Sequence, residues 1–343
     1  MRCFKFIAAC TIACGLASTA LAQPPALEGV HRVVFLGDSI TYDGRYIEYI
    51  AAYLRLKYPK LDCQLLDLGL PSETCSGLSE PGHAGGKFPR PDVHERLERV
   101  LAKTKPDLLV ACYGMNCGMY YPFSPERFER YQQGLERLRS AAAARHIRVL
   151  LVTPPTFDPV PIKDRTLPAG LAEYRQPFAG YNDVLDRYSQ WLVGQRSAGW
   201  DVVDVHTPMN RLLAAGRAAD PQFKLAADGV HMGAAGHLLM AREILRHWGE
   251  PAEVVRGPLS VVSGKDQPTT DHGQRTPEAW LATMPHGAEV LKLVSQRQRL
   301  LKNAWLSATG RQRPGMRPGL PLDEAELQAG KIDQQIRELV NRP

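Results

Sequence analysis

The sequence has little of what metal-binding or nucleic-acid-binding proteins use. Only seven of its 343 residues are cysteine, and the histidines, cysteines and carboxylates show no spacing typical of a metal site. We therefore expect no metal and no cofactor. The formal net charge of +6 is too small to indicate a nucleic-acid partner. No internal repeat and no low-complexity tract interrupts an ordinary globular composition, with 44% hydrophobic and 23% charged residues.

The first 22 residues resemble a secretory signal peptide. Arg2 and Lys5 precede an apolar run over residues 6–16, and Ala20-Leu21-Ala22 has the small-residue pattern of a cleavage site. The apolar run is shorter than the roughly 20 residues that a spanning helix needs. We therefore expect an exported protein, periplasmic or secreted, with no membrane span.

Cleavage after Ala22 changes the charge and the cysteine content of the chain. The net charge falls by two, to +4, because two basic residues and no acidic residue are removed. An exported compartment permits disulfides. Four cysteines remain, at Cys63, Cys75, Cys112 and Cys117.

The stretch Val33–Thr41 is the one around which the chain is organised. Val33 to Leu36 is apolar at every position, as in a strand buried on both faces, and Gly37 ends that strand. Ser39 is then expected at the carboxyl end of a strand, where open α/β sheets bind ligands. Two interpretations remain at this point: Ser39 is a nucleophile, or Asp38 and Ser39 only cap the following helix.

Strand and helix patterns alternate five times along the chain. This alternation predicts a parallel five-stranded sheet with helices on both faces. A helix is expected near residues 174–193, and the α/β unit is expected to end near Trp248. The expected strands cover residues 33–36, 63–68, 108–111, 149–152 and 202–205.

The part of the chain after residue 250 has a different character. Proline, glycine, arginine and glutamine become frequent, and no further strand-helix alternation is visible. We expect one helix over residues 290–305, a connector over 310–321 and a second helix over 322–339. The division is thus a signal peptide (1–22), a main α/β domain (23–250) and a C-terminal helical extension (251–343), which we interpret as packed on the domain and not as a separate binding arm.

Four strand-end loops carry residues suited to acyl transfer. A serine hydroxyl needs a base to take its proton, and histidine titrates in the right range, while a carboxylate fixes the histidine tautomer. Asp228 and His231, three residues apart in a turn before a helix, are candidates to face Ser39. The amide of Asn116 is a candidate donor to an oxyanion.

These loops resemble the blocks of the SGNH, or GDSL-type, hydrolase family. The matching segments are Gly37-Asp38-Ser39-Ile40, Asp67-Leu68-Gly69-Leu70-Pro71-Ser72-Glu73-Thr74, Gly114-Met115-Asn116 and Asp228-Gly229-Val230-His231. The resemblance implies a flavodoxin-like three-layer α/β/α sandwich and metal-free ester hydrolysis. It also implies Ser39 as nucleophile, His231 as base and Asp228 as its orienting acid. The oxyanion hole would comprise the amides of Ser39 and Ser72 and the Asn116 side chain.

Three positions depart from the family pattern. Asp67 stands where the family usually has asparagine, Ser72 where it usually has glycine, and Cys117 where it usually has aspartate. A positive φ at Ser72 would be strained. Because Cys75 and Cys117 both lie in loops expected beside the site, we hypothesise a disulfide between them, with two separate thiols as the alternative.

The sequence therefore predicts an exported serine esterase acting on acyl esters, such as acetyl groups on carbohydrate. One alternative is a lipase or thioesterase, which would need an apolar groove along residues 69–86 and 114–122. Another is a catalytically impaired carbohydrate-binding protein in which the loops with Ser72 and Cys117 have lost their geometry. Acyl transfer to a second sugar would use the same residues.

Overall fold

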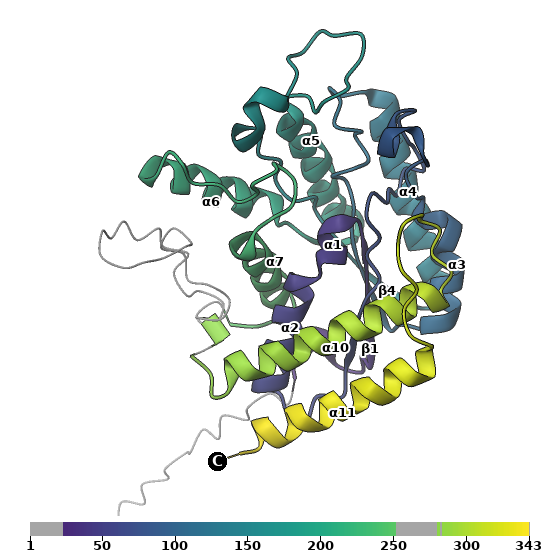
Figure 1. Cartoon of the computed structure of the whole chain (residues 1–343), viewed down its shortest axis with the longest axis vertical. Helices are drawn as coiled ribbons and strands as arrows, with labels where there is room; N and C mark the ends of the chain where they lie inside the picture. The colour runs from purple at the N-terminus through teal and green to yellow at the C-terminus, as the bar shows by residue number, and fades with distance from the viewer. Residues whose placement is uncertain (1–22, 252–279, 282, 343) are drawn as a thin grey trace, which may run out of the picture.

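A computed structural model describes residues 23–251, 280, 281 and 283–342 (Figure 1). Its centre is a five-stranded parallel sheet with the strand order β2-β1-β3-β4-β5. The predicted signal peptide, residues 1–22, lies outside the described residues. The strands are β1 (Arg32–Gly37), β2 (Gln64–Asp67), β3 (Leu108–Cys112), β4 (Arg148–Val152) and β5 (Asp201–Val203).

The strand order determines which helices cover which face of the sheet. The order reverses once, at β1, so right-handed connections place the helix after β1 on one face and those after β2, β3 and β4 on the other. The first of these helices is α2 (Arg45–Lys57), and the other three are α3 (Val93–Thr104), α4 (Pro125–Ala143) and α5 (Tyr181–Gly194). Helix α7 (Ala234–His247) packs against α2. The result is the three-layer α/β/α sandwich with flavodoxin-like strand order that the sequence predicts.

Two helices differ from the expectation. The helix expected near residues 174–193 begins only at Tyr181, because Pro177 and Gly180 keep the preceding segment in a loop. Helix α6 (His206–Ala219) was not expected. Pro208 is the third residue of this helix, in the first turn, where proline is tolerated. Both errors concern connections, and the sheet is unaffected.

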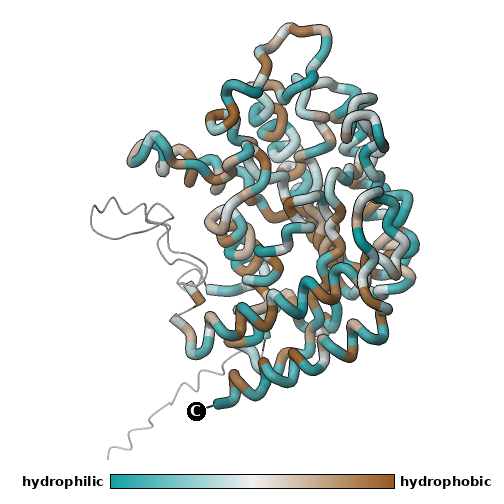
Figure 2. Tube along the Cα trace, in the orientation of Figure 1, coloured by the Kyte–Doolittle hydropathy of each residue, from teal (hydrophilic) through white to brown (hydrophobic). Residues whose placement is uncertain are grey.

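Two helices of the C-terminal segment lie against the α/β unit. Helix α10 (Gly287–Ala308) runs alongside α2 and contacts β2, and α11 (Leu322–Val340) lies beside α10 (Figure 1). Hydrophobic positions gather where the sheet lies, whereas α11 alternates between hydrophilic and hydrophobic along its length (Figure 2). The apolar side chains Val290, Val294 and Leu301 of α10 are buried, so this helix extends the core.

Within the part of the chain that the structure describes, no helix is long and apolar enough to cross a membrane.

Candidate active site

Ser39 begins α1 (Ser39–Asp43), a short helix that follows β1 almost directly. The cap of this helix is Asp38, whose Oδ1 atom accepts a hydrogen bond from the Ile40 amide at 2.9 Å. Burial raises the pKa of Asp38 to about 6, against the lowering effect of the Ile40 hydrogen bond. Capping is therefore the role of Asp38, and the Ser39 side chain is engaged elsewhere.

His231 bridges Ser39 and Asp228. Its Nε2 atom lies 2.7 Å from Ser39 Oγ, and its Nδ1 atom lies 2.6 Å from Asp228 Oδ2. A carboxylate at Nδ1 places the imidazole proton there, so that Nε2 accepts the hydrogen bond that the Ser39 hydroxyl donates. The side chains of His231 and Asp228 are 48% and 52% exposed, so a substrate can reach them. The structure thus brings together the three residues predicted as a triad.

The loop around Asp228 keeps this carboxylate charged and oriented. Asp228 Oδ1 accepts hydrogen bonds from the amides of Val230 at 3.0 Å and His231 at 2.8 Å. Burial alone would raise the pKa of Asp228, but hydrogen bonds from His231 and from the Val230 amide bring it below its usual value. Gly229 has a φ of +81°, and a Cβ atom there would lie 2.7 Å from the Asp158 carbonyl oxygen. Glycine is therefore required at this position.

Asn116 lies in the loop after β3 with its amide held from both ends. Its Oδ1 atom accepts hydrogen bonds from Arg90 Nη1 and Tyr120 Oη, each at 3.0 Å. Its Nδ2 atom donates to the Glu73 carbonyl at 3.3 Å. Because Oδ1 has two donors, the NH₂ group is fixed on the opposite side. One of its N–H groups has no partner among the described residues.

Arg90 and Tyr120 are residues that sequence reasoning missed in this role. Arg90 is itself held by Glu80, which pairs with its Nε and Nη2 atoms at 2.7 Å each. The centre of the Tyr120 ring lies 4.9 Å from that of the Tyr181 ring. The contact between Arg90 and Asn116 spans 26 positions and two loops, so no local pattern could have indicated it.

Ser72 occupies the third position of a β-turn over Leu70–Glu73. The Glu73 amide donates to the Leu70 carbonyl at 3.1 Å, and Ser72 has a φ of +69°. The strained conformation anticipated for a residue at this position is therefore present. Within the described residues, no hydrogen bond occupies the amide of Ser72 or that of Ser39. Both are available to a ligand.

Cys75 and Cys117 face each other between the second and third of these loops. Their Sγ atoms lie 3.7 Å apart, and both side chains are buried. Both are free thiols in the structure. A disulfide between them remains a proposal that requires oxidation. Cys63 and Cys112 are buried elsewhere.

Arg45 contacts both the segment that carries His231 and the helix that carries Ser39. Its Nη2 atom donates to the carbonyl of Met232, the residue after His231, at 2.9 Å. The same guanidinium pairs with Asp43, the last residue of the helix that begins with Ser39, at 2.6 Å. One arginine, which sequence analysis did not identify, therefore connects the segments that carry the nucleophile and the base.

A cavity of about 760 Å³ lies beside Tyr120. Its walls come from three loops, namely residues 80–82, 119–121 and 172–177. Tyr120 lines it and donates a hydrogen bond to Asn116, so this side chain connects the cavity with Asn116. Metal ligation has no candidate here: across the described residues, no three histidine, cysteine or carboxylate side chains converge as ligands would.

Several solved structures are similar to this chain. BT4096, a gut microbial diltiazem-metabolizing enzyme, matches with 22% identity and a TM-score of 0.46, over 64% of this chain and 47% of its own. A catalytic mutant of Axe2, an acetylxylan esterase from Geobacillus stearothermophilus, matches with 21% identity and a TM-score of 0.46, over 64% and 94%. The acetyl xylan esterase AlAXEase matches with 19% identity and a TM-score of 0.45, over 63% and 98%. This chain thus spans about half the length of the first of these proteins and nearly all of the other two.

Sequence comparison gives the family. A search of curated proteins found no match. The family model described as GDSL-like Lipase/Acylhydrolase matches residues 35–239, from β1 into α7. Since this match covers more than half of the chain, the protein belongs to the GDSL-like lipase/acylhydrolase family and is an SGNH-type ester hydrolase.

Proposed function

We propose that the protein is an exported serine esterase that uses Ser39 as nucleophile, His231 as general base and acid, and Asp228 as the orienting acid. The observation that carries this proposal is the continuous hydrogen-bonded chain from Ser39 Oγ through His231 to Asp228, at 2.7 and 2.6 Å. Export is inferred from the signal-like residues 1–22.

The proton transfers follow from the two hydrogen bonds of His231. As Ser39 Oγ attacks the ester carbonyl carbon, its proton moves to Nε2, and the imidazolium is stabilised by Asp228. The same proton then passes to the leaving alcohol oxygen as the acyl-enzyme forms. Water repeats the sequence, giving its proton to His231 and releasing the acid from Ser39.

Three donors would stabilise the tetrahedral oxyanion. These are the amides of Ser39 and Ser72 and one N–H of Asn116 Nδ2, none of which has a hydrogen-bond partner among the described residues. Removing one such donor costs about 3 kcal/mol in known cases. Arg90 and Tyr120 support the third donor, because their hydrogen bonds to Oδ1 prevent the Asn116 amide from flipping.

The substrate is proposed to be a short acyl ester, such as an acetyl group, of a polar alcohol such as a carbohydrate. The cavity beside Tyr120 is lined by the charged residues Glu80, Glu173 and Arg175 together with tyrosines. The charged groups suit hydrogen bonds with hydroxyl groups, and the tyrosine rings suit packing on sugar rings.

The test is hydrolysis of p-nitrophenyl esters by the mature chain and its Ser39→Ala variant. We expect acetate to be cleaved faster than octanoate, and cleavage to fall to the buffer rate in Ser39→Ala. Acetylated xylo-oligosaccharides, with and without an added acceptor sugar, would separate hydrolysis from acyl transfer. Equal rates for the two folded proteins would contradict the proposal and favour the binding-protein alternative.

A further inference from the structure

The turn that carries Ser72 can exist in two forms. Pro71 is its second residue and Ser72 its third, with a φ of +69°. A positive φ at the third position defines a type II turn, which normally has glycine or asparagine there. Pro71 at the second position is equally compatible with a type I turn, in which the third residue has a negative φ.

These forms differ in the orientation of one peptide group, the one between Pro71 and Ser72. The Pro71 carbonyl and the Ser72 amide belong to the same plane and point in opposite directions. Rotating that plane by half a turn would relieve the positive φ of Ser72 and reverse the direction of its N–H. A serine at this position therefore favours the form that removes a proposed oxyanion donor.

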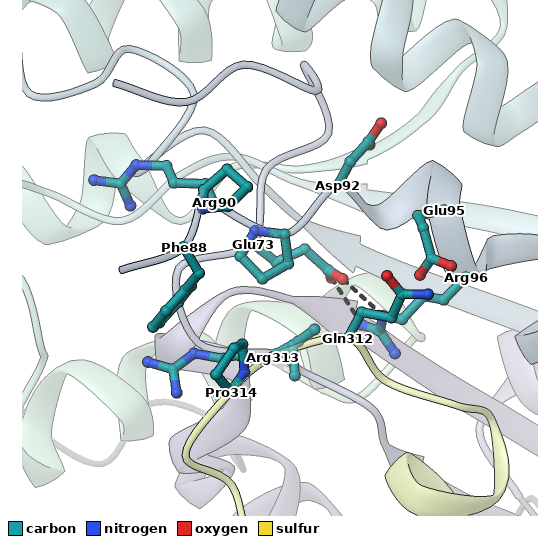
Figure 3. Close-up of a pocket in the computed structure, with 12 residues that line it drawn as sticks. Glu73, Phe88, Arg90, Asp92, Glu95, Arg96, Gln312, Arg313 and Pro314 are labelled. Atoms are coloured by element: carbon teal, nitrogen blue, oxygen red, sulfur yellow. Dashed lines mark hydrogen bonds and ion pairs between the residues drawn. The ribbon is translucent and has the colours of Figure 1, made fainter. Parts of the chain in front are cut away.

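Arg313 opposes that rotation. Its Nε atom donates to the Pro71 carbonyl at 2.9 Å, a bond that exists only while this carbonyl points towards the connector between α10 and α11. Its guanidinium lies 5.4 Å from the centre of the Phe88 ring (Figure 3). A hydrogen bond at the carbonyl also strengthens the amide of the same peptide as a donor. Arg313 forms no ion pair within the described part of the chain, so no ion pair competes with its hydrogen bond to the Pro71 carbonyl.

The backbone that carries Arg313 is itself held in place. Arg99 of α3 donates to the carbonyls of Thr309 at 3.0 Å and Gly310 at 2.9 Å. Lys302 of α10 lies 3.4 Å from Asp67, whose other oxygen accepts the Gly69 amide at 2.9 Å. The C-terminal segment is thus fixed to the loop after β2 at several points.

We propose that Arg313 is a positioning residue, which holds the Pro71–Ser72 peptide so that the Ser72 amide can donate to the oxyanion. The hydrogen bond from Arg313 thus stabilises the type II turn, which glycine at position 72 would favour through its own tolerance of a positive φ. The C-terminal extension therefore contributes to the active site without touching the reacting atoms. This inference rests on the proposed function, in which the Ser72 amide is an oxyanion donor.

The test is a double-mutant cycle between Arg313→Ala and Ser72→Gly, with kcat and KM measured on p-nitrophenyl acetate. Arg313→Ala should lower kcat on the order of tenfold and leave KM within about twofold, since displaced catalytic groups act on the transition state. In the Ser72→Gly background the same change should cost less than about threefold, because glycine favours the type II turn unaided. Affinity for phenylboronic acid, which forms a tetrahedral adduct on a reactive serine, should fall in parallel with kcat.

The matched control is Arg317→Ala, which removes an exposed arginine of the same connector and should leave kcat unchanged. Arg313→Lys, which keeps one donor, provides the comparison if Arg313→Ala does not fold. Equal losses in the serine and glycine backgrounds, or no difference between Arg313→Ala and Arg317→Ala, would overturn the inference while Ser39-dependent activity persists. Loss of Ser39 dependence in the parent protein would instead indicate failure of the proposed function.

Discussion

The Nε2 atom of His231 lies 2.7 Å from the Oγ atom of Ser39, although 192 positions separate the two residues. The parallel sheet makes this contact possible, because the carboxyl ends of its strands meet at one edge. Ser39 follows β1 and His231 precedes α7, and α7 packs on the helix that follows Ser39. The fold therefore converts two distant loops into one site.

The hydroxyl of Tyr120 is expected to support catalysis through Asn116. Tyr120→Phe removes one of the two donors to Asn116 Oδ1, and a hydrogen bond of this kind is worth about 1 kcal/mol. We expect kcat/KM for p-nitrophenyl acetate to fall by roughly fivefold. Tyr121→Phe is the control, since no hydrogen bond of its hydroxyl is found among the described residues. An equal effect of both changes would point to a role in the cavity and not in orienting Asn116.

Stability should depend on pH through Asp38. Its pKa is raised from 3.8 to about 6 by burial, so the native state holds this proton more tightly than the unfolded chain. The contribution of Asp38 to stability is complete below pH 3.8 and is lost as pH rises through about 6. Asp38→Asn stays neutral, so its unfolding free energy relative to the parent protein should rise by about 2 kcal/mol between pH 4 and pH 7. Urea unfolding at several pH values measures the unfolding free energy of both proteins. The same pH dependence in the parent protein and in Asp38→Asn would contradict a raised pKa of Asp38.

The positive φ of Ser72 should cost stability. Ser72→Gly removes the strain of a Cβ atom at a φ of +69°, against a smaller entropic penalty for glycine in the unfolded chain. We expect the unfolding free energy to increase by about 1 kcal/mol. Ser197→Gly, at an exposed serine without a positive φ, should be neutral or destabilising. A loss of stability in Ser72→Gly would show that the turn is not strained.

Cys75 and Cys117 should form a disulfide under oxidising conditions. Oxidised glutathione would accept the two electrons, and each thiol would lose its proton as the Sγ–Sγ bond forms. Peptide mapping of the non-reduced protein should find the two cysteine peptides joined, with the loss of two hydrogen atoms. Cys63→Ser should not affect this product. Peptides that remain separate after prolonged oxidation would reject the proposed bridge.

The sequence predicted the sheet and the triad because both have local signals. Apolar runs mark the buried strands, and the residues Asp228 and His231 lie three apart in one short turn. Connections were harder to predict. Helix α6 was not predicted, although its Pro208 lies in the first turn, where proline is tolerated.

The residues that support the site could not be found from local patterns. Arg90 reaches Asn116, Arg45 reaches Met232, and Arg313 reaches Pro71 across 242 positions. An arginine in a loop is most often a solvated surface residue, and its partner is known only once the loops are placed. For Ser72, the sequence showed a serine where the family usually has glycine, but it did not give the φ of that residue. Strain was therefore predicted only for the case of a positive φ.

The most direct test of the proposed triad is covalent labelling of the folded protein with a fluorophosphonate, followed by peptide mapping. We expect one adduct per chain, on Ser39, absent in Ser39→Ala and formed at least ~100-fold more slowly in His231→Ala. Such a result would establish that His231 activates Ser39. An adduct on another residue, or labelling of Ser39 at the same rate without His231, would contradict the proposed mechanism.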